Sequence, residues 1–187
     1  MNEDWLKKKM EQAYDLIEKA NDQMMDIWLG YILFSWQWWL GMVLSIAPWI
    51  LWIKLRNKQM AGCLLLAGFF VIIISSWLDS LGVALGLWHY TWEVIPFIPA
   101  NLPWNFSLLP VTVMFFLQYK PTISPFIKAL AFAGFSAYIA EPLSQWIGLY
   151  EPEQWRRMYS FLIYIVIYLM AHYLSTRTRF AKVHRHP

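Results

Sequence analysis

Five long apolar stretches constrain this chain more than any other feature, because each is long enough to consider as a membrane span. They occupy residues 27–53, 59–78, 94–119, 124–143 and 158–176. A helix rises about 1.5 Å per residue and needs about 20 apolar residues to cross the hydrocarbon core. With 59% hydrophobic and 14% charged residues, the chain is too apolar for a soluble domain of 187 residues. The sequence therefore predicts an all-α integral membrane protein with about five transmembrane helices.

The third stretch is the least regular of the five. Three prolines lie between residues 96 and 103, so its helix is expected to begin near Trp104 or Asn105 and to end near Gln118. Pro110 lies inside that short helix. A full crossing and a re-entrant segment both remain open for this stretch.

The charges divide unequally between the two sides of a five-span chain. All twelve acidic residues lie on one side, together with six basic residues. The other side receives nine basic residues and no acid: Lys54, Arg56, Lys58, Lys120, Lys128, Arg177, Arg179, Lys182 and Arg185. Basic loops remain in the cytoplasm. We therefore expect an external amino terminus and a cytoplasmic carboxyl terminus, with the inverted orientation as the alternative.

Three regions follow from this division: an amphipathic helix over residues 1–26, a transmembrane domain over 27–176 and a basic cytoplasmic tail over 177–187. The first region is too long and too acidic for a secretory signal. Its apolar residues recur in steps of four and three, which is a heptad pattern: Leu6, Met10, Ala13, Ile17, Ala20, Met24 and Ile27. This helix could lie on the membrane surface, cover its own loops or pair with a second copy.

A candidate pocket lies on the acidic side, near the ends of the second and fourth spans. Its residues are Asp79, Trp88, His89, Glu93, Glu141 and Gln145. Ionisable groups at a membrane need a partner or a polar site, so these groups are functional candidates. The alternative is structural: the acids could end helices or pair with Arg156 or Arg157. One His four residues before a Glu is a weak metal signal, and we predict no metal and no cofactor.

A series of short motifs runs through nearly the whole chain after Asp26. They are Trp38-Trp-Leu, Pro48-Trp-Ile-Leu-Trp, Asp79 with Gly82, Gly86-Leu-Trp-His-Tyr, Leu109-Pro, Gln118-Tyr, Glu141-Pro-Leu, and Trp155 followed by Tyr159-Ser. In these motifs the chain resembles a family of small polytopic membrane proteins from endospore-forming Gram-positive bacteria. The resemblance implies a multi-pass protein of the bacterial plasma membrane and nothing catalytic.

A second, local likeness concerns Asp79, Gly86, Trp88 and Tyr90. This spacing resembles the Asp…Gly-x-Trp-x-aromatic signature of the small membrane lycopene cyclases. Those enzymes follow it with a proline and paired glutamates for acid–base chemistry. Here the corresponding segment, Leu102-Pro-Trp-Asn-Phe, contains no acid. The likeness therefore implies a shared fold with a different function.

Three functions are compatible with these features. The leading hypothesis is a non-enzymatic accessory or ligand-binding protein whose external acidic and aromatic pocket takes a small molecule or lipid. The alternatives are an enzyme acting on a lipid or isoprenoid, with Asp79 or Glu141 as general acid, and a cation or proton transporter. The expected partners are the lipid bilayer and a second copy of the chain. A net charge of only +3 gives no indication of nucleic-acid binding.

Overall fold

The computed structural model describes residues 3–98 and 100–177, so the predicted tail beyond Arg177 lies outside the described residues. The regular elements of the described chain are all helical except for one pair of two-residue antiparallel strands. The elements are α1 (Glu3–Ile27), η1 (Trp28–Ile32), α2 (Trp36–Leu55), α3 (Ala61–Ala84), β1 (Trp88–His89), η2 (Trp104–Leu108), α4 (Leu109–Gln118), α5 (Pro125–Phe135), η3 (Ser136–Ala140), α6 (Glu141–Trp146), β2 (Glu151–Pro152) and α7 (Arg157–Arg177). The three η elements are π-helical turns.

Four helices are long and apolar enough to cross a membrane. They are α2, α3, α7 and the continuous helix Pro125–Trp146, which joins α5, η3 and α6. The segment Trp104–Gln118 forms a shorter apolar helix, beginning and ending where the sequence predicted. At about 1.5 Å per residue it is about 22 Å long, which is less than the roughly 30 Å hydrocarbon core. The chain is thus a multi-span membrane protein with four candidate spans and one short companion helix.

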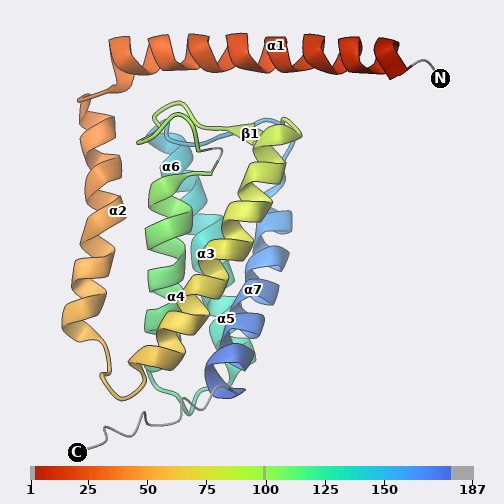
Figure 1. Cartoon of the computed structure of the whole chain (residues 1–187). Coiled ribbons are helices and arrows are strands. Elements are labelled where there is room, and N and C mark those ends of the chain that lie inside the picture. Colours follow the sequence, from red (N-terminus) through yellow and green to blue (C-terminus); the bar gives the residue numbers. More distant parts are fainter. Residues whose placement is uncertain (1–2, 99, 178–187) are drawn as a thin grey trace, which may run out of the picture.

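The helices α3, α4, α5 and α7 form a bundle, and α2 stands beside it (Figure 1). Large buried side chains fill the bundle's core, among them Tyr168, Phe132, Leu64 and Met114. By contrast, α2 buries only Gly41 and Trp52.

Indole groups attach α2 to the bundle. Trp49 Nε1 donates to the carbonyl of Phe106 at 2.8 Å, and Trp38 Nε1 donates to the carbonyl of Val94 at 3.1 Å. Val94 lies in irregular backbone, where carbonyls lack a regular helical partner, so the Trp38 indole satisfies a group that would otherwise be costly in a membrane.

The predicted amino-terminal helix is present as α1, which lies across one end of the bundle at a steep angle to the spans (Figure 1). None of its described residues is buried, and the apolar residues of its heptad pattern are exposed. The first span begins at Trp36, later than the start of the apolar stretch at residue 27, because Ser35 caps it. The Ser35 hydroxyl accepts from the backbone N–H of Trp38 at 3.2 Å.

Two glycines end helices at the same end of the bundle. Gly86 follows α3 with a φ of 67°, and Gly148 follows α6 with a φ of 80°. In each case the next residue donates its backbone N–H five residues back, to Gly82 or to Ser144, as in a Schellman motif. The two turns direct the chain into β1 and β2, which pair Trp88 with Pro152 and His89 with Glu151. This pairing closes the end of the bundle above the candidate site.

Candidate functional site

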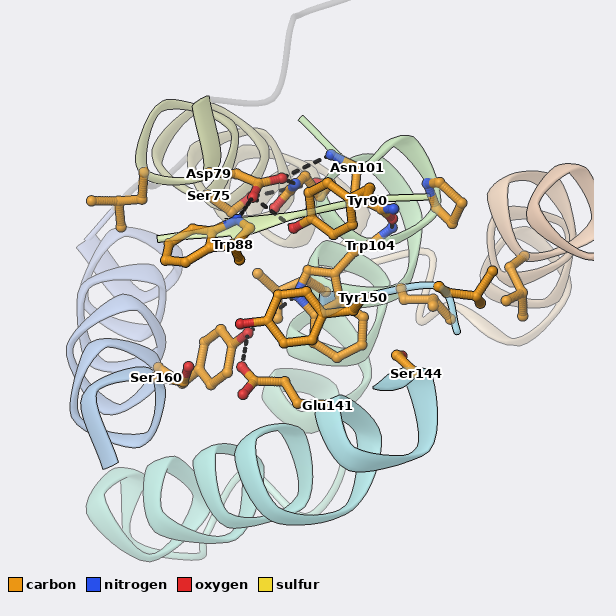
Figure 2. A pocket seen from close by; sticks show the side chains of 18 of the residues that line it. Ser75, Asp79, Trp88, Tyr90, Asn101, Trp104, Glu141, Ser144, Tyr150 and Ser160 are labelled. Carbon is orange, nitrogen blue, oxygen red and sulfur yellow. Dashed lines mark hydrogen bonds between the residues drawn. The ribbon is translucent and has the colours of Figure 1, made fainter. Parts of the chain in front are cut away.

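A cavity of about 120 Å³ lies at the end of the bundle that carries β1, β2 and α6. This is room for about four water molecules at their volume in the liquid. Aromatic side chains form a large part of the wall, and two carboxylates, from Asp79 and Glu141, belong to it (Figure 2). The aromatic members are Trp88, Tyr90, Trp92, Trp104, Tyr150, Trp155 and Tyr164. Among the described residues, no Lys, Arg or His lines this cavity.

Asp79 is buried near the end of α3 and accepts hydrogen bonds on both carboxylate oxygens. Oδ1 accepts from Trp88 Nε1 at 2.7 Å and from the Tyr90 hydroxyl at 2.6 Å. Oδ2 accepts from the backbone N–H of Asn101 at 2.8 Å and from the side-chain amide of Asn105. Burial, with the nearby Asp79 charge, holds the pKa of Tyr90 well above its usual range, so this hydroxyl remains a donor. Asp79 therefore joins α3, the following loop and η2.

The indole of Trp88 reaches Asp79 only because residue 82 is a glycine. A Cβ atom on Gly82 would lie 2.0 Å from Trp88 Cζ2 and 2.1 Å from Cη2. The ring packs on the helix backbone and also contacts Trp155 edge to face, with centroids 4.8 Å apart. Gly82 thus has a specific steric role in building the cavity wall.

Glu141 begins α6 and is also buried. Its Oε1 accepts from the Tyr164 hydroxyl at 2.8 Å, and the Ser160 hydroxyl lies nearby. Each of these hydroxyls accepts an indole N–H in turn, Tyr164 from Trp104 at 3.2 Å and Ser160 from Trp155 at 2.8 Å. Figure 2 shows the Glu141 side chain directed toward the side of the cavity where Ser160 lies. One indole–hydroxyl relay, from Trp104 through Tyr164, therefore ends at this carboxylate, and a second indole–hydroxyl pair lies beside it.

The two carboxylates differ in how fully their acceptor positions are used. A carboxylate offers about four lone-pair sites. Asp79 accepts four hydrogen bonds, whereas Glu141 accepts one, from Tyr164, with the Ser160 hydroxyl nearby. Asp79 is therefore saturated within the protein, and Glu141 retains acceptor capacity toward the cavity.

A π-helical turn contains or precedes the cavity residues on two of the helices that form the site. The turn η2 includes Trp104 and Asn105, and the turn η3 directly precedes Glu141. A π-helical turn shifts the register of the residues that follow it, and such turns occur frequently at functional sites. Here they rotate a polar group of each helix toward one cavity.

The sequence-predicted site residues do not all face this cavity. Asp79, Trp88 and Glu141 line it, whereas Gln145 lines an adjoining hollow and accepts from Arg157 Nη2 at 3.1 Å. The exposed His89 lies outside, with Nδ1 3.5 Å from a carboxylate oxygen of Glu153.

Glu93 is not among the residues that line the cavity, and it lies partly buried in the loop after β1. Its backbone carbonyl accepts from Trp28 Nε1 at 3.0 Å. Burial, aided by the negative charge of Asp79, raises the pKa of Glu93 to about 8. The side chain is thus mainly neutral at pH 7, so it adds little negative charge to this end of the bundle.

Several site residues were not predicted, and they lie far apart in the sequence. They are Tyr90, Asn101, Asn105, Tyr150, Trp155, Ser160 and Tyr164. Asn105 carried a usable signal, since it is a polar residue within an apolar stretch. Tyr164 and Ser160 gave none, because single hydroxyl groups are common in membrane helices.

The site and fold together define a multi-span membrane protein with an acidic and aromatic cavity. Among the described residues, no group of three or more His, Cys, Asp or Glu side chains is arranged to hold a metal ion. No protein-family model, curated protein or solved structure matches the chain.

Proposed function

We propose that this protein is a membrane-embedded binding protein for an organic ammonium group. The supporting observation is Glu141, a buried carboxylate with spare acceptor capacity on an aromatic cavity whose described wall contains no base. Aromatic faces attract ammonium groups through the quadrupole of the ring, and the attraction strengthens when water is excluded. A carboxylate in the same cavity adds direct charge pairing. An anion would gain none of these interactions.

The two carboxylates have different roles in this proposal. Asp79 holds the loop and η2 against α3, because its acceptor positions are filled by protein donors. Glu141 accepts the N–H groups of the ligand, while Tyr164 and Ser160 fix its orientation. Ligand recognition therefore depends on Glu141, and the shape of the cavity depends on Asp79.

We place the protein in the bacterial plasma membrane with the cavity on the external side. The distribution of acidic and basic residues supports this orientation. The exposed heptad face of α1 supports pairing with a second copy.

The test is a titration of the purified protein, in detergent micelles, with ethylammonium by isothermal calorimetry. We expect saturable binding that Glu141→Gln weakens at least about tenfold, because the ligand loses its charge partner. The matched control is Glu153→Gln, which removes an exposed carboxylate at the same end of the protein but outside the cavity. Equal binding by both variants, or no binding by the wild-type protein, would refute the proposal.

A further inference from the structure

A second hollow adjoins the aromatic cavity and differs from it in charge. It measures about 480 Å³, and Arg156 and Arg157 both line it. Glu141, Tyr150 and Trp155 line both hollows, so these three side chains form a shared wall. A carboxylate-bearing cavity and a guanidinium-bearing hollow therefore meet at Glu141.

The two arginines occupy an unusual place in the charge pattern. The other Lys and Arg residues between residues 36 and 177 lie near the helix ends that are farthest from β1 (Figure 1): Lys54, Arg56, Lys58, Lys120, Lys128 and Arg177. Arg156 and Arg157 are exposed, and within residues 3–98 and 100–177 neither lies within ion-pair distance of a carboxylate. Arg157 uses one of its nitrogens on Gln145. Most of the guanidinium donors remain available to a ligand.

A guanidinium group presents its donors in a planar fork that matches a phosphate, and two adjacent arginines match its charge. We propose that the two hollows together bind a phosphorylated amine. The ammonium group enters the aromatic cavity at Glu141, and the phosphate lies on Arg156 and Arg157. This inference rests on the proposed ammonium site and adds the second half of the ligand.

The lining of the outer hollow favours a lipid as the source of this group. Tyr138 and Met158 line it, belong to two candidate membrane spans and are about half exposed, at 48% and 53%. Exposed apolar side chains on membrane helices contact acyl chains. The ligand we assign is therefore an amine-bearing phospholipid whose headgroup turns inward between α6 and α7 while its chains remain in the bilayer.

The test compares three probes on the purified protein in micelles: ethylammonium, phosphoethanolamine and a short-chain phosphatidylethanolamine. We expect phosphoethanolamine to bind about tenfold more tightly than ethylammonium, because two charge-assisted contacts are added. Arg156→Gln combined with Arg157→Gln should remove this gain, so that the variant binds phosphoethanolamine no more tightly than ethylammonium. The control is Lys54→Gln combined with Lys58→Gln, which removes the same charge from exposed residues at the other end. If the arginine pair variant does not fold, as judged by near-ultraviolet circular dichroism, Arg156→Gln alone makes the same test.

The outcomes separate this inference from the proposed function. Ethylammonium binding without a gain from phosphate, or a gain that survives the arginine substitutions, overturns the inference alone. Absence of ethylammonium binding overturns the proposed function. Tighter binding of the short-chain lipid than of phosphoethanolamine supports the lipid source, and equal binding overturns that assignment in favour of a soluble phosphorylated amine.

Discussion

Substitution of Gly82 by alanine tests whether Trp88 and Asp79 build the cavity wall. The added Cβ atom would lie 2.0 to 2.6 Å from three atoms of the Trp88 ring, whereas ordinary van der Waals contact begins near 3.4 Å. The ring must therefore move by more than an ångström. That displacement breaks the 2.7 Å bond from Trp88 Nε1 to Asp79 and disturbs the edge-to-face contact with Trp155.

The size of the effect follows from these contacts. A hydrogen bond to a charged group contributes about 1.5 to 3 kcal/mol, and an aromatic pair contributes about 0.5 to 1.5 kcal/mol. Alanine in place of glycine gains about 1 kcal/mol of helix propensity. We expect a net loss of about 2 kcal/mol, which for a chain of this size lowers the unfolding midpoint by about 4 to 8 °C.

Gly134→Ala is the matched control for Gly82→Ala. Gly134 also lies in a membrane helix, and no atom would lie within 4 Å of its added Cβ. It should retain the wild-type midpoint or exceed it slightly, because only the propensity gain applies. The assay is thermal unfolding in micelles, followed by near-ultraviolet circular dichroism. Equal midpoints for the two alanine variants would refute the packing of Trp88 on α3.

Four further predictions follow from the site and from α1. Asp79→Asn should destabilise the protein by about 3 kcal/mol, because the new NH2 group cannot accept and leaves the donors that face it unpaired. Chemical unfolding in mixed micelles measures this loss. Since the pKa of Glu93 is raised to about 8 from an ordinary value of 4.5, the folded state binds the proton more tightly, and the unfolding midpoint should fall as pH rises from about 4.5 to 8. Glu93→Gln should remove that fall, and a pH slope unchanged by the substitution would contradict the assignment. A cysteine at Ala13 should cross-link two copies if the heptad face of α1 pairs, whereas one at the exposed Leu16 should cross-link less. Lipid extracts from cells with and without the protein should be identical in composition if it binds without turnover, and a new or missing lipid species would favour the enzyme instead.

Much of the fold could be predicted because membrane spans are encoded locally. An uninterrupted apolar stretch gives a span directly, so α7 and the short helix ending at Gln118 lie close to their predicted bounds, whereas α3 continues six residues past its predicted end at residue 78. The start of α2 was predicted too early. The stretch from residue 27 contains no charge, and composition alone does not show that Ser35 begins a new helix. The separation of α1 from α2 depends on that cap.

The site was less predictable because its chemistry depends on contacts between distant segments. Sequence position placed Asp79 and Glu141 at one end of the bundle, and both line the cavity. His89 and Glu93 stand four residues apart, a spacing that gives a shared face only in a helix, and β1 instead extends the chain there and pairs it with β2. His89 instead lies close to Glu153, more than sixty residues away. No local pattern carries that pairing, because it arises from two glycine turns on different helices.

Asp79 and Glu141 differ in how many of their acceptor positions are filled by protein donors, and this difference bears on the role of Glu141. Two buried acids in an apolar wall would each be costly if left without partners. The protein compensates Asp79 fully with four donors, drawn from β1, the following loop and η2. Glu141 accepts from only one hydroxyl, that of Tyr164, although indoles and tyrosines surround both acids. A purely structural role would favour full compensation at both positions. A binding site requires this difference, since a ligand can supply the hydrogen-bond donors that the protein does not provide to Glu141.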